Sequence, residues 1–419
     1  MRPNSIVNRF SSIIVTLLIC SVAAAEEEAP VSLQDALLKG KINFNLRLRA
    51  EIVEQDGLDG ARAFTERIRL GYGTQTWNGL MAYVEMEDIR SADDDRYFDG
   101  TPNGSDEQGN KAVVADPEDT ELNQFYIKYT WEWVTVIAGR QRIILDNARF
   151  VGNVGWRQNE QTFDAYTLKA APIENLQIFY SYVADVNRIF GPDSEEDFKS
   201  DSHLVNVSYS NVPVLGKIVL FAYCLDLDSS PVNSSSTYGG LVTGSNPLAG
   251  EDLSIKHLLS YAIQQENGDN TTDYEADYYM VDLSVARKGL GSVGAGYEVL
   301  GADDDSSGGV FRTPLATLHA FNGWADAFLI TPSEGLQDLY FYAGTSFWGM
   351  KAKIVKHFYS TDDGCIFDGS KDNLGQELDA VLSKKINQNV SALVKAAWFN
   401  GKDLYADRAK VWLQTDISF

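Results

Sequence analysis

The sequence predicts an all-β fold, a transmembrane antiparallel β-barrel of 18 strands (16 is the alternative) with both termini periplasmic. Short segments of alternating apolar and polar residues recur along the chain. The connections between them alternate between short and long. The chain also ends on an alternating strand that stops at Phe419. Barrels of the bacterial outer membrane show this pattern because every strand has one face toward lipid and one toward the lumen.

The N-terminus carries a predicted secretory signal peptide, residues 1–25. It has a basic start, an apolar run over residues 13–22 and three alanines before an acidic run. This layout is typical of a cleaved signal, and the apolar run is too short to span a bilayer comfortably. The rest divides into a periplasmic N-terminal segment, residues 26–39, and a transmembrane β-barrel, residues 40–419.

Three cysteines leave open questions. Cys20 raises a lipoprotein alternative, which Ile19 disfavours because lipoprotein processing requires a small residue before the cysteine. Two free thiols are the plain interpretation for Cys224 and Cys365, and a disulfide between them, which an oxidising compartment would allow, is the alternative. By the predicted topology both fall on the extracellular side, on strands well separated around the barrel.

The chain is strongly acidic, with a net charge of −24. This balance argues against a nucleic-acid-binding protein, which needs a basic surface. The acidic residues gather in the long connections, including Asp93–Asp95 and Asp303–Asp305. A solvated loop surface is the plain interpretation, and divalent cations bridging to lipopolysaccharide are the alternative.

Seventeen strands can be read from the alternation. They are 40–54, 63–77, 79–89, 120–130, 132–141, 160–170, 174–184, 201–210, 215–226, 254–264, 274–286, 291–300, 336–346, 348–358, 375–385, 389–398 and 407–419. Bacterial single-chain barrels have an even number. Counting from either terminus makes both 215–226 and 254–264 run outward, so an inward strand must lie between them. Residues 235–245 are the candidate, with a turn at Asn246-Pro247.

The connections sort by length onto two sides. The short ones are 77–79, 130–132, 172–175, 211–216, 288–290, 347–348 and 385–389. The long ones are 90–119, 142–159, 185–200, 301–335 and 359–374. Four tryptophans stand at the short turns: Trp77, Trp131, Trp133 and Trp348. Tryptophan favours the membrane–water boundary, so we place this boundary at the short turns, on the periplasmic side.

The second face of each strand predicts the lining of the lumen. Its basic residues are Arg47, Arg49, Arg67, Arg69, Arg140, Arg142, Lys351, Lys353, Lys395 and Lys410. Its acidic residues are Glu51, Glu85, Glu87, Glu377, Asp379 and Asp416. Because the last strand pairs with the first in a closed barrel, Lys410 belongs to the wall that carries Arg47. Two interpretations stay open: ion pairs that hold neighbouring strands, or a basic track that attracts an anionic solute.

Two long connections are expected to fold into the barrel. Residues 314–332 are too apolar for a free external loop, so we expect them to narrow the pore. The candidate constriction residues are His319, Phe321, Asn322, Trp324 and Asp326. The connection 142–159, which contains Arg149, Trp156 and Arg157, is expected to do the same. His319 is a candidate pH sensor, and a packed loop histidine is the alternative.

Residues from Gly139 to Ala165 resemble the hallmark stretch of the alginate-export family of outer-membrane barrels. A second stretch, Pro314–Asp326 followed by Gly335–Tyr340, is similar to another part of that family. The resemblance implies an eighteen-stranded monomeric barrel that passes solutes. In the alginate exporter, arginines line the pore and guide a polyuronate. The resemblance implies this part for Arg47, Arg49, Arg67, Arg69, Arg140, Arg142, Arg149 and Arg157.

Three functions are considered. The leading one is a passive outer-membrane porin for small anionic or polyhydroxylated solutes, because of the predicted basic wall and the apolar loop that is expected to turn inward. The lumenal acids depart from a purely basic track for a polyuronate, and many family members look like small-solute porins. The alternatives are an export channel for an anionic polysaccharide such as alginate, and an adhesin or structural anchor. No enzyme activity, cofactor or metal site is expected, because the four histidines are scattered. The expected partners are a small-molecule or oligosaccharide solute, outer-membrane lipid and lipopolysaccharide, and the assembly machinery through Phe419, with no nucleic acid.

Overall fold

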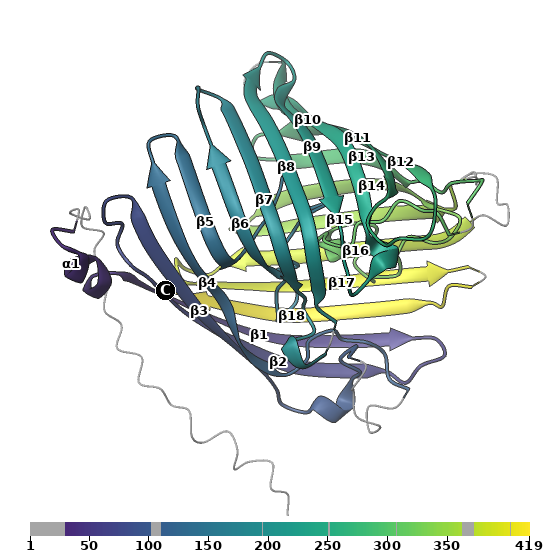
Figure 1. Ribbon diagram of the computed structural model, residues 1–419. Helices are drawn as coiled ribbons and strands as arrows, with labels where there is room; N and C mark the ends of the chain where they lie inside the picture. Colours follow the sequence, from purple (N-terminus) through teal and green to yellow (C-terminus); the bar gives the residue numbers. More distant parts are fainter. Residues whose placement is uncertain are drawn as a thin grey trace, which may run out of the picture.

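The computed structural model describes residues 30–101, 110–194, 196–249, 252–306, 308–362, 373–402 and 404–419. These residues form one antiparallel sheet that closes on itself, because β1 pairs with both β2 and β18 (Figure 1). The strands are β1 Lys41–Gln55, β2 Ala61–Gly73, β3 Leu80–Ser91, β4 Asp119–Trp131, β5 Val134–Gln141, β6 Thr162–Ala170, β7 Leu176–Asn187, β8 Phe198–Val212, β9 Gly216–Leu225, β10 Ser235–Ala249, β11 Leu253–Glu266, β12 Glu275–Arg287, β13 Gly291–Leu300, β14 Leu336–Phe347, β15 Met350–Ser360, β16 Asn373–Lys385, β17 Val390–Gly401 and β18 Arg408–Ser418. The prediction of an eighteen-stranded barrel is confirmed.

The strand that parity required is β10. It pairs with β9 and β11, as an inward strand between two outward ones must. The turn expected at Asn246-Pro247 is wrong. Asn246 pairs with Ile255 and Pro247 with Ser254, so both lie within β10, which continues to Ala249. Proline is tolerated here because the register shifts immediately after it, between Pro247 and Ala249, and an irregular site needs no ladder N–H from that residue.

The alternation of side chains separates the two faces of the wall. Along β2 buried and more exposed residues alternate without interruption. Phe64, Ile68 and Leu70 point outward and are exposed, whereas Arg67 and Arg69 point inward and are buried. An apolar outer face with a polar inner face suits a barrel in lipid. Among the described helices, none is long and apolar enough to cross a membrane.

The barrel closes at the last residue of the chain. The Phe419 N–H donates to the Phe44 carbonyl oxygen at 3.0 Å, and the Phe44 N–H donates to the Phe419 oxygen at 3.2 Å. The register continues along the strands and pairs Arg47 with Asp416. Lys410 of β18 pairs with Val53 of β1, the strand that also carries Arg47. Lys410 and Arg47 therefore belong to the same part of the barrel wall, as predicted.

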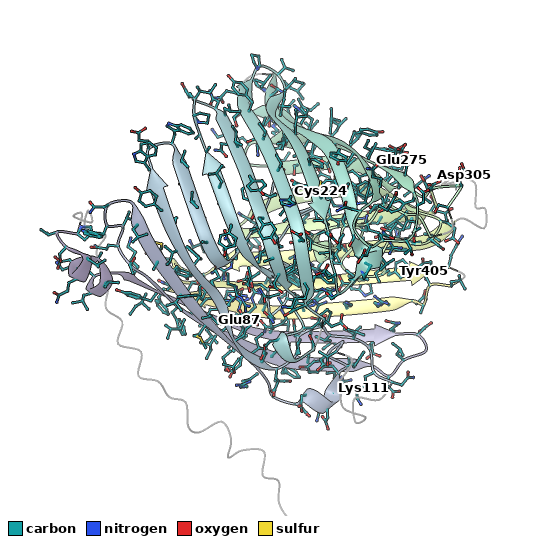
Figure 2. The ribbon with its side chains drawn as sticks, in the orientation of Figure 1. Glu87, Lys111, Cys224, Glu275, Asp305 and Tyr405 are labelled. Carbon is teal, nitrogen blue, oxygen red and sulfur yellow. The ribbon has the colours of Figure 1, made fainter. Side chains whose placement is uncertain are left out.

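The short turns and the long connections lie at opposite ends of the barrel. The short helix α1, Leu33–Leu38, lies at the same end as the C-terminus (Figure 1). Its Ala36 carbonyl accepts from the Gln75 N–H in the turn between β2 and β3. Glu275 and Asp305 lie at the other end (Figure 2). The predicted signal peptide lies outside the described residues.

Two long connections pack inside the barrel. We name them loop A, residues 142–161, and loop B, residues 301–335. Val151 of loop A and Leu315 of loop B are buried in one cluster with wall residues such as Leu204. Their backbones also join, since the Gly152 N–H donates to the Leu315 carbonyl oxygen at 2.8 Å. Both predicted inward loops therefore pack inside the barrel and against each other.

Candidate functional site

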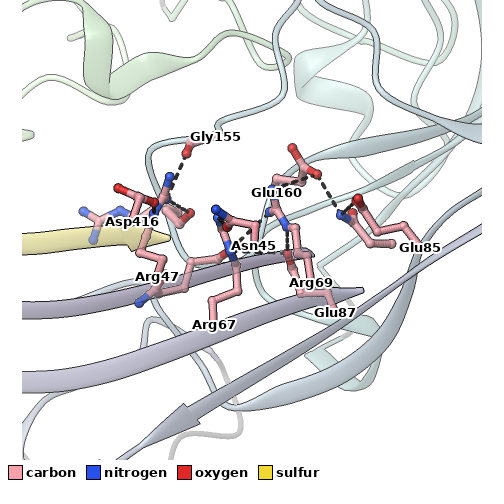
Figure 3. A network of polar contacts seen from close by, with 12 residues as sticks. Asn45, Arg47, Arg67, Arg69, Glu85, Glu87, Gly155, Glu160 and Asp416 are labelled. Carbon is pink, nitrogen blue, oxygen red and sulfur yellow. Dashed lines mark hydrogen bonds and ion pairs between the residues drawn. The ribbon is translucent and has the colours of Figure 1, made fainter. Parts of the chain in front are cut away.

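The arginines of β1 hold the backbone of loop A. Nη1 of Arg47 donates to the carbonyl oxygens of Gly155, Trp156 and Arg157 at 3.1, 3.2 and 3.2 Å (Figure 3). Its Nε donates to Asp416 at 2.8 Å. Because guanidinium is a planar fork of five donors, one side chain can hold both the loop and the neighbouring strand.

The other three arginines of this wall extend the arrangement. Arg49 donates to the Trp156 carbonyl oxygen, and its Cζ lies 4.4 Å from the centroid of the Trp156 ring. Arg67 and Arg69 both donate to the Gln158 carbonyl, at 3.2 and 3.4 Å. We call Arg47, Arg49, Arg67 and Arg69 the loop clamp. Its members bring backbone carbonyls of loop A to the wall, and three of them are almost completely buried.

Carboxylates complete the clamp. Glu160 at the end of loop A lies 3.2 Å from Arg69 and also pairs with Arg142 (Figure 3). Glu87 of β3 pairs with Arg69. Asp116, in the connection between β3 and β4, lies 3.4 Å from Arg49. The structure therefore brings the predicted arginines together, with acids and carbonyls as their partners.

Asp326 is the centre of the contact between loop B and its surroundings. It accepts from Arg157 of loop A at 3.0 Å, from Lys410 of β18 at 2.6 Å and from His319 Nδ1 at 2.6 Å. Burial alone would raise the pKa of this carboxyl. His319, Lys410 and Arg157 outweigh burial and hold the pKa well below its usual range. Asp326 is therefore charged at neutral pH and offsets the bases around it.

The tip of loop B is held through its backbone as well. The Ala325 N–H donates to Glu377 at 2.7 Å and the Trp324 N–H donates to Asp379 at 3.2 Å. Arg408 donates to the carbonyl oxygens of Ala325 and Asp326 at 2.9 and 2.7 Å. Acids of β16 thus accept the N–H groups of the tip, while a base of β18 donates to its carbonyls.

Arg149 joins loop A to the opposite wall. It is 1% exposed. It donates to Glu298 of β13 at 2.6 Å, to Thr313 at 3.1 Å and to Asn322 at 3.1 Å. Its guanidinium lies 4.8 Å from the Phe321 ring centroid. Arg149 and Arg157 were both predicted as site residues. In the structure, both hold loop A to loop B.

Not every predicted lining residue reaches the lumen. Arg140 pairs in register with Phe125, which is 54% exposed on the outer face. It hydrogen-bonds Asp164 at 2.8 and 3.0 Å. The prediction for Arg140 is wrong because strand parity turns it outward. Arg142 reaches the lumen although it has the same parity, because β5 ends at Gln141 and loop A turns inward there.

Lys351 and Lys353 lie on the inward face of β15, with His357 and Tyr359. Both lysines are exposed, and Lys353 lies 4.9 Å from the Tyr342 ring centroid. They stand nearer the short-turn end than the buried His357. The structure therefore separates them from the loop clamp.

Three pockets open inside the barrel. An outer pocket of about 460 Å³ lies at the long-loop end, and its charged lining is Arg149, Arg188, Arg312, Glu196 and Asp197. A middle pocket of about 480 Å³ lies on the short-turn side, and its charged lining is Arg142, Lys169, Lys217, Glu132 and Asp146. Beside it a basic pocket of about 360 Å³ has Lys41, Lys128 and Arg142 and no acidic residue among the described residues that line it.

Several residues of this site were missing from the predicted set. Glu298 occupies an inward position in the alternation of β13, so strand parity could have identified it. Lys128 and Lys169 also have inward parity and could have been found in the same way. Asp116 and Glu160 lie in connections, and no periodic signal points to them. Among the described residues, no group of three or more His, Cys, Asp and Glu side chains is arranged to hold a metal.

Comparison with known proteins agrees with this architecture. The family model described as "Alginate export" matches residues 41–279. The chain belongs to the alginate-export family. No curated protein sequence matches this family member.

Solved structures share the fold of this alginate-export family member at low sequence identity. OccAB4 of Acinetobacter baumannii is 15% identical with a TM-score of 0.69, over 90% of this chain and 98% of that one. OccK9 of Pseudomonas aeruginosa is 13% identical with a TM-score of 0.70, over 92% and 100%. OpdK of Pseudomonas aeruginosa, solved with vanillate, is 14% identical with a TM-score of 0.67, over 90% and 98%. These likenesses agree with the observed fold. Family membership, together with the closed sheet and its apolar outer face, identifies an integral barrel of the bacterial outer membrane.

Proposed function

We propose that the protein is a passive outer-membrane channel for small anionic solutes. The observation that supports this most is the sign of the charge in the pockets. The chain carries a net charge of −24, yet the basic pocket has three cations and no acid among its described lining residues. Basic residues also outnumber acidic ones in the middle and outer pockets. A local excess of cations raises the concentration of anions in a channel.

The predicted arginines do not all act as a track for the solute. The loop clamp uses its arginines on carbonyls and carboxylates of the protein, which leaves little for a solute. Solute contact falls instead to Lys128 and Lys169, which line the pockets on the short-turn side. Arg142 lines the same pockets but already pairs with Glu85 and Glu160. In the membrane we assign this side to the periplasm. The solved relative crystallised with vanillate, an aromatic carboxylate, fits a preference for small carboxylates.

Export of an anionic polysaccharide is the second candidate, and the family model supports it. A polymer needs a continuous wide path. Loops A and B pack inside the barrel, and the pockets on either side of them measure only about 460 and 480 Å³, which favours a small solute over a polymer. Deletion of the gene in its natural host separates the two. The export proposal requires the loss of exopolysaccharide secretion, and the channel proposal requires that secretion continue.

The channel proposal is tested in planar bilayers under a salt gradient. The wild-type reversal potential should report anion preference, and the double change Lys128→Gln with Lys169→Gln should move it toward cations. Lys199→Gln with Lys356→Gln is the matched control, because it removes the same charge from the outer face of β8 and β15. No conductance steps, or cation preference that the lumenal changes leave unaltered, would refute the proposal.

A further inference from the structure

The side chain of Lys395 is enclosed by aromatic rings inside the barrel. Its Nζ lies 4.0 Å from the ring centroids of both Trp156 and Trp324, and 5.4 Å from that of Trp412. Lys395 stands on β17 and is 6% exposed. The three rings come from loop A, loop B and β18. An ammonium over aromatic faces is attracted electrostatically, and more strongly where water is excluded.

A hydrogen bond fixes the lysine within this cage. Lys395 Nζ lies 2.6 Å from His319 Nε2. Lysine carries only donors, so His319 accepts at Nε2 and keeps its proton on Nδ1, where it donates to Asp326 at 2.6 Å. The His319 ring also stacks on Trp156, with centroids 4.7 Å apart and planes at 9°. This tautomer follows from the partners of the two nitrogens.

We propose that Lys395 is a positioning residue, a latch that holds loops A and B in the lumen through the tryptophan cage and neutral His319, and that protonation of His319 releases it. The latch rests on the proposed channel function. It adds to that function a named contact that sets how far the lumen is closed.

The charges around His319 explain the sensitivity to protons. Lys395 faces it from β17 and Arg157 from loop A, while Asp326 of its own loop is the nearest acid and is shared with Lys410 of β18. A protonated His319 loses the acceptor that Lys395 uses and adds a positive charge beside it. Burial lowers the pKa of His319 well below its ordinary value, Lys395 and Arg157 lower it further, and Asp326 opposes them.

The sign of the pH effect follows from linkage. Docked His319 binds a proton less readily than a released, hydrated histidine does, so the released state takes up protons as the pH falls. The stability that neutral His319 contributes to the docked state is present above about pH 6.5, the ordinary histidine pKa, and is lost as the pH falls below it. Acid should therefore open the latch.

Single-channel recording of the full-length protein tests the latch. Lys395→Ala should raise the ratio of open to closed dwell times by at least about tenfold, because the loss of one buried cation–π contact alone is of this order. n-Propylammonium, which matches the removed part of the side chain, should restore closure, and neutral 1-propanol should not. His319→Gln keeps an acceptor but cannot titrate, so it should stay closed between about pH 6.5 and pH 5, above the range in which Glu160 takes up a proton. Lys356→Met is the control, because Lys356 lies 5.4 Å from a phenylalanine ring on the outer face of β15.

Three results would overturn the latch. These are wild-type dwell times in Lys395→Ala, equal rescue by propanol and propylammonium, or opening between about pH 6.5 and pH 5 that persists in His319→Gln. Should Lys395→Ala fail to fold, the His319→Gln profile decides alone. Selectivity is read from the reversal potential and the latch from dwell times, so each proposal can fail separately. Tryptophan emission against pH adds a readout that needs no conduction: the acid change expected in the wild type should vanish in His319→Gln, and its persistence there would contradict the latch.

Discussion

Arg157 and Asp326 form a 3.0 Å ion pair that joins loop A to loop B inside the barrel. Both side chains are almost completely buried. Lys410 reaches the same carboxylate from the wall at 2.6 Å, so neither loop can leave without breaking a contact of the other. The constriction behaves as one body for this reason.

Asp326→Asn tests that coupling. The change leaves Arg157 and Lys410 without their shared anion, and breaking a buried ion pair costs about 3–5 kcal/mol. We expect looser loops, seen as a higher unit conductance in planar bilayers and a lower temperature of heat-induced unfolding. Asp35→Asn is the control, since the Lys39–Asp35 pair is exposed and contributes little. An unchanged conductance would contradict the coupling.

Arg47→Gln separates a clamp from a solute track. In the structure, Nη1 of Arg47 donates hydrogen bonds to three carbonyl oxygens of loop A. Losing them should free the loop, so conductance should rise while the reversal potential stays the same. A falling conductance with a shift toward cations would show instead that Arg47 guides the permeating anion.

Gly323→Ala tests the close approach at the tip of loop B. Gly323 has a φ of +88°, and an added Cβ would overlap Tyr359 Oη and Glu377 Oε2. Gly349 has a φ of +74° with nothing near the position of its Cβ, so Gly349→Ala carries only the backbone strain. We expect Gly323→Ala to lose about 1–3 kcal/mol more, the usual cost of overpacking, as measured by thermal unfolding. Equal losses of stability in Gly323→Ala and Gly349→Ala would mean that the tip of loop B can shift to make room for the added methyl group.

Glu160 predicts a second acid step, lower in pH than that of His319. Burial raises the pKa of Glu160, but Arg69 and Arg142 outweigh burial and lower it from 4.5 to about 2. The carboxylate therefore stabilises the docked loop above pH 4.5, and this contribution, about 3 kcal/mol, is lost as the pH falls toward 2. Dwell times measured in a His319→Gln background should show the step. Glu160→Gln should lack it and be loosened already at pH 7. A step that survives in Glu160→Gln would exclude this carboxylate as its source.

Most of the wall was predictable because a strand has a period of exactly two residues in its side-chain direction. Alternation identified seventeen strands, and the even strand number then located β10, although its sequence of Ser, Thr and Gly carries little apolar signal. The turn at Asn246-Pro247 failed because residues typical of turns can also stand in a strand beside a register shift. Among the described residues Cys224 has no disulfide partner, and Cys365 lies outside them, so the pairing of these two cysteines stays a prediction.

The sequence by itself determined the barrel, the number of its strands and the inward direction of Arg47, Arg49, Arg67 and Arg69, because these follow from local periodicity and closure. Only the tertiary structure decided what these arginines do. Their partners are carbonyls of loop A, which lies about 90 to 110 residues further along the chain. A guanidinium binds a loop carbonyl as readily as a solute carboxylate, so the choice depends on which acceptor the fold brings within hydrogen-bonding distance. The same holds for Lys395, whose tryptophan cage exists only after two loops and two strands meet.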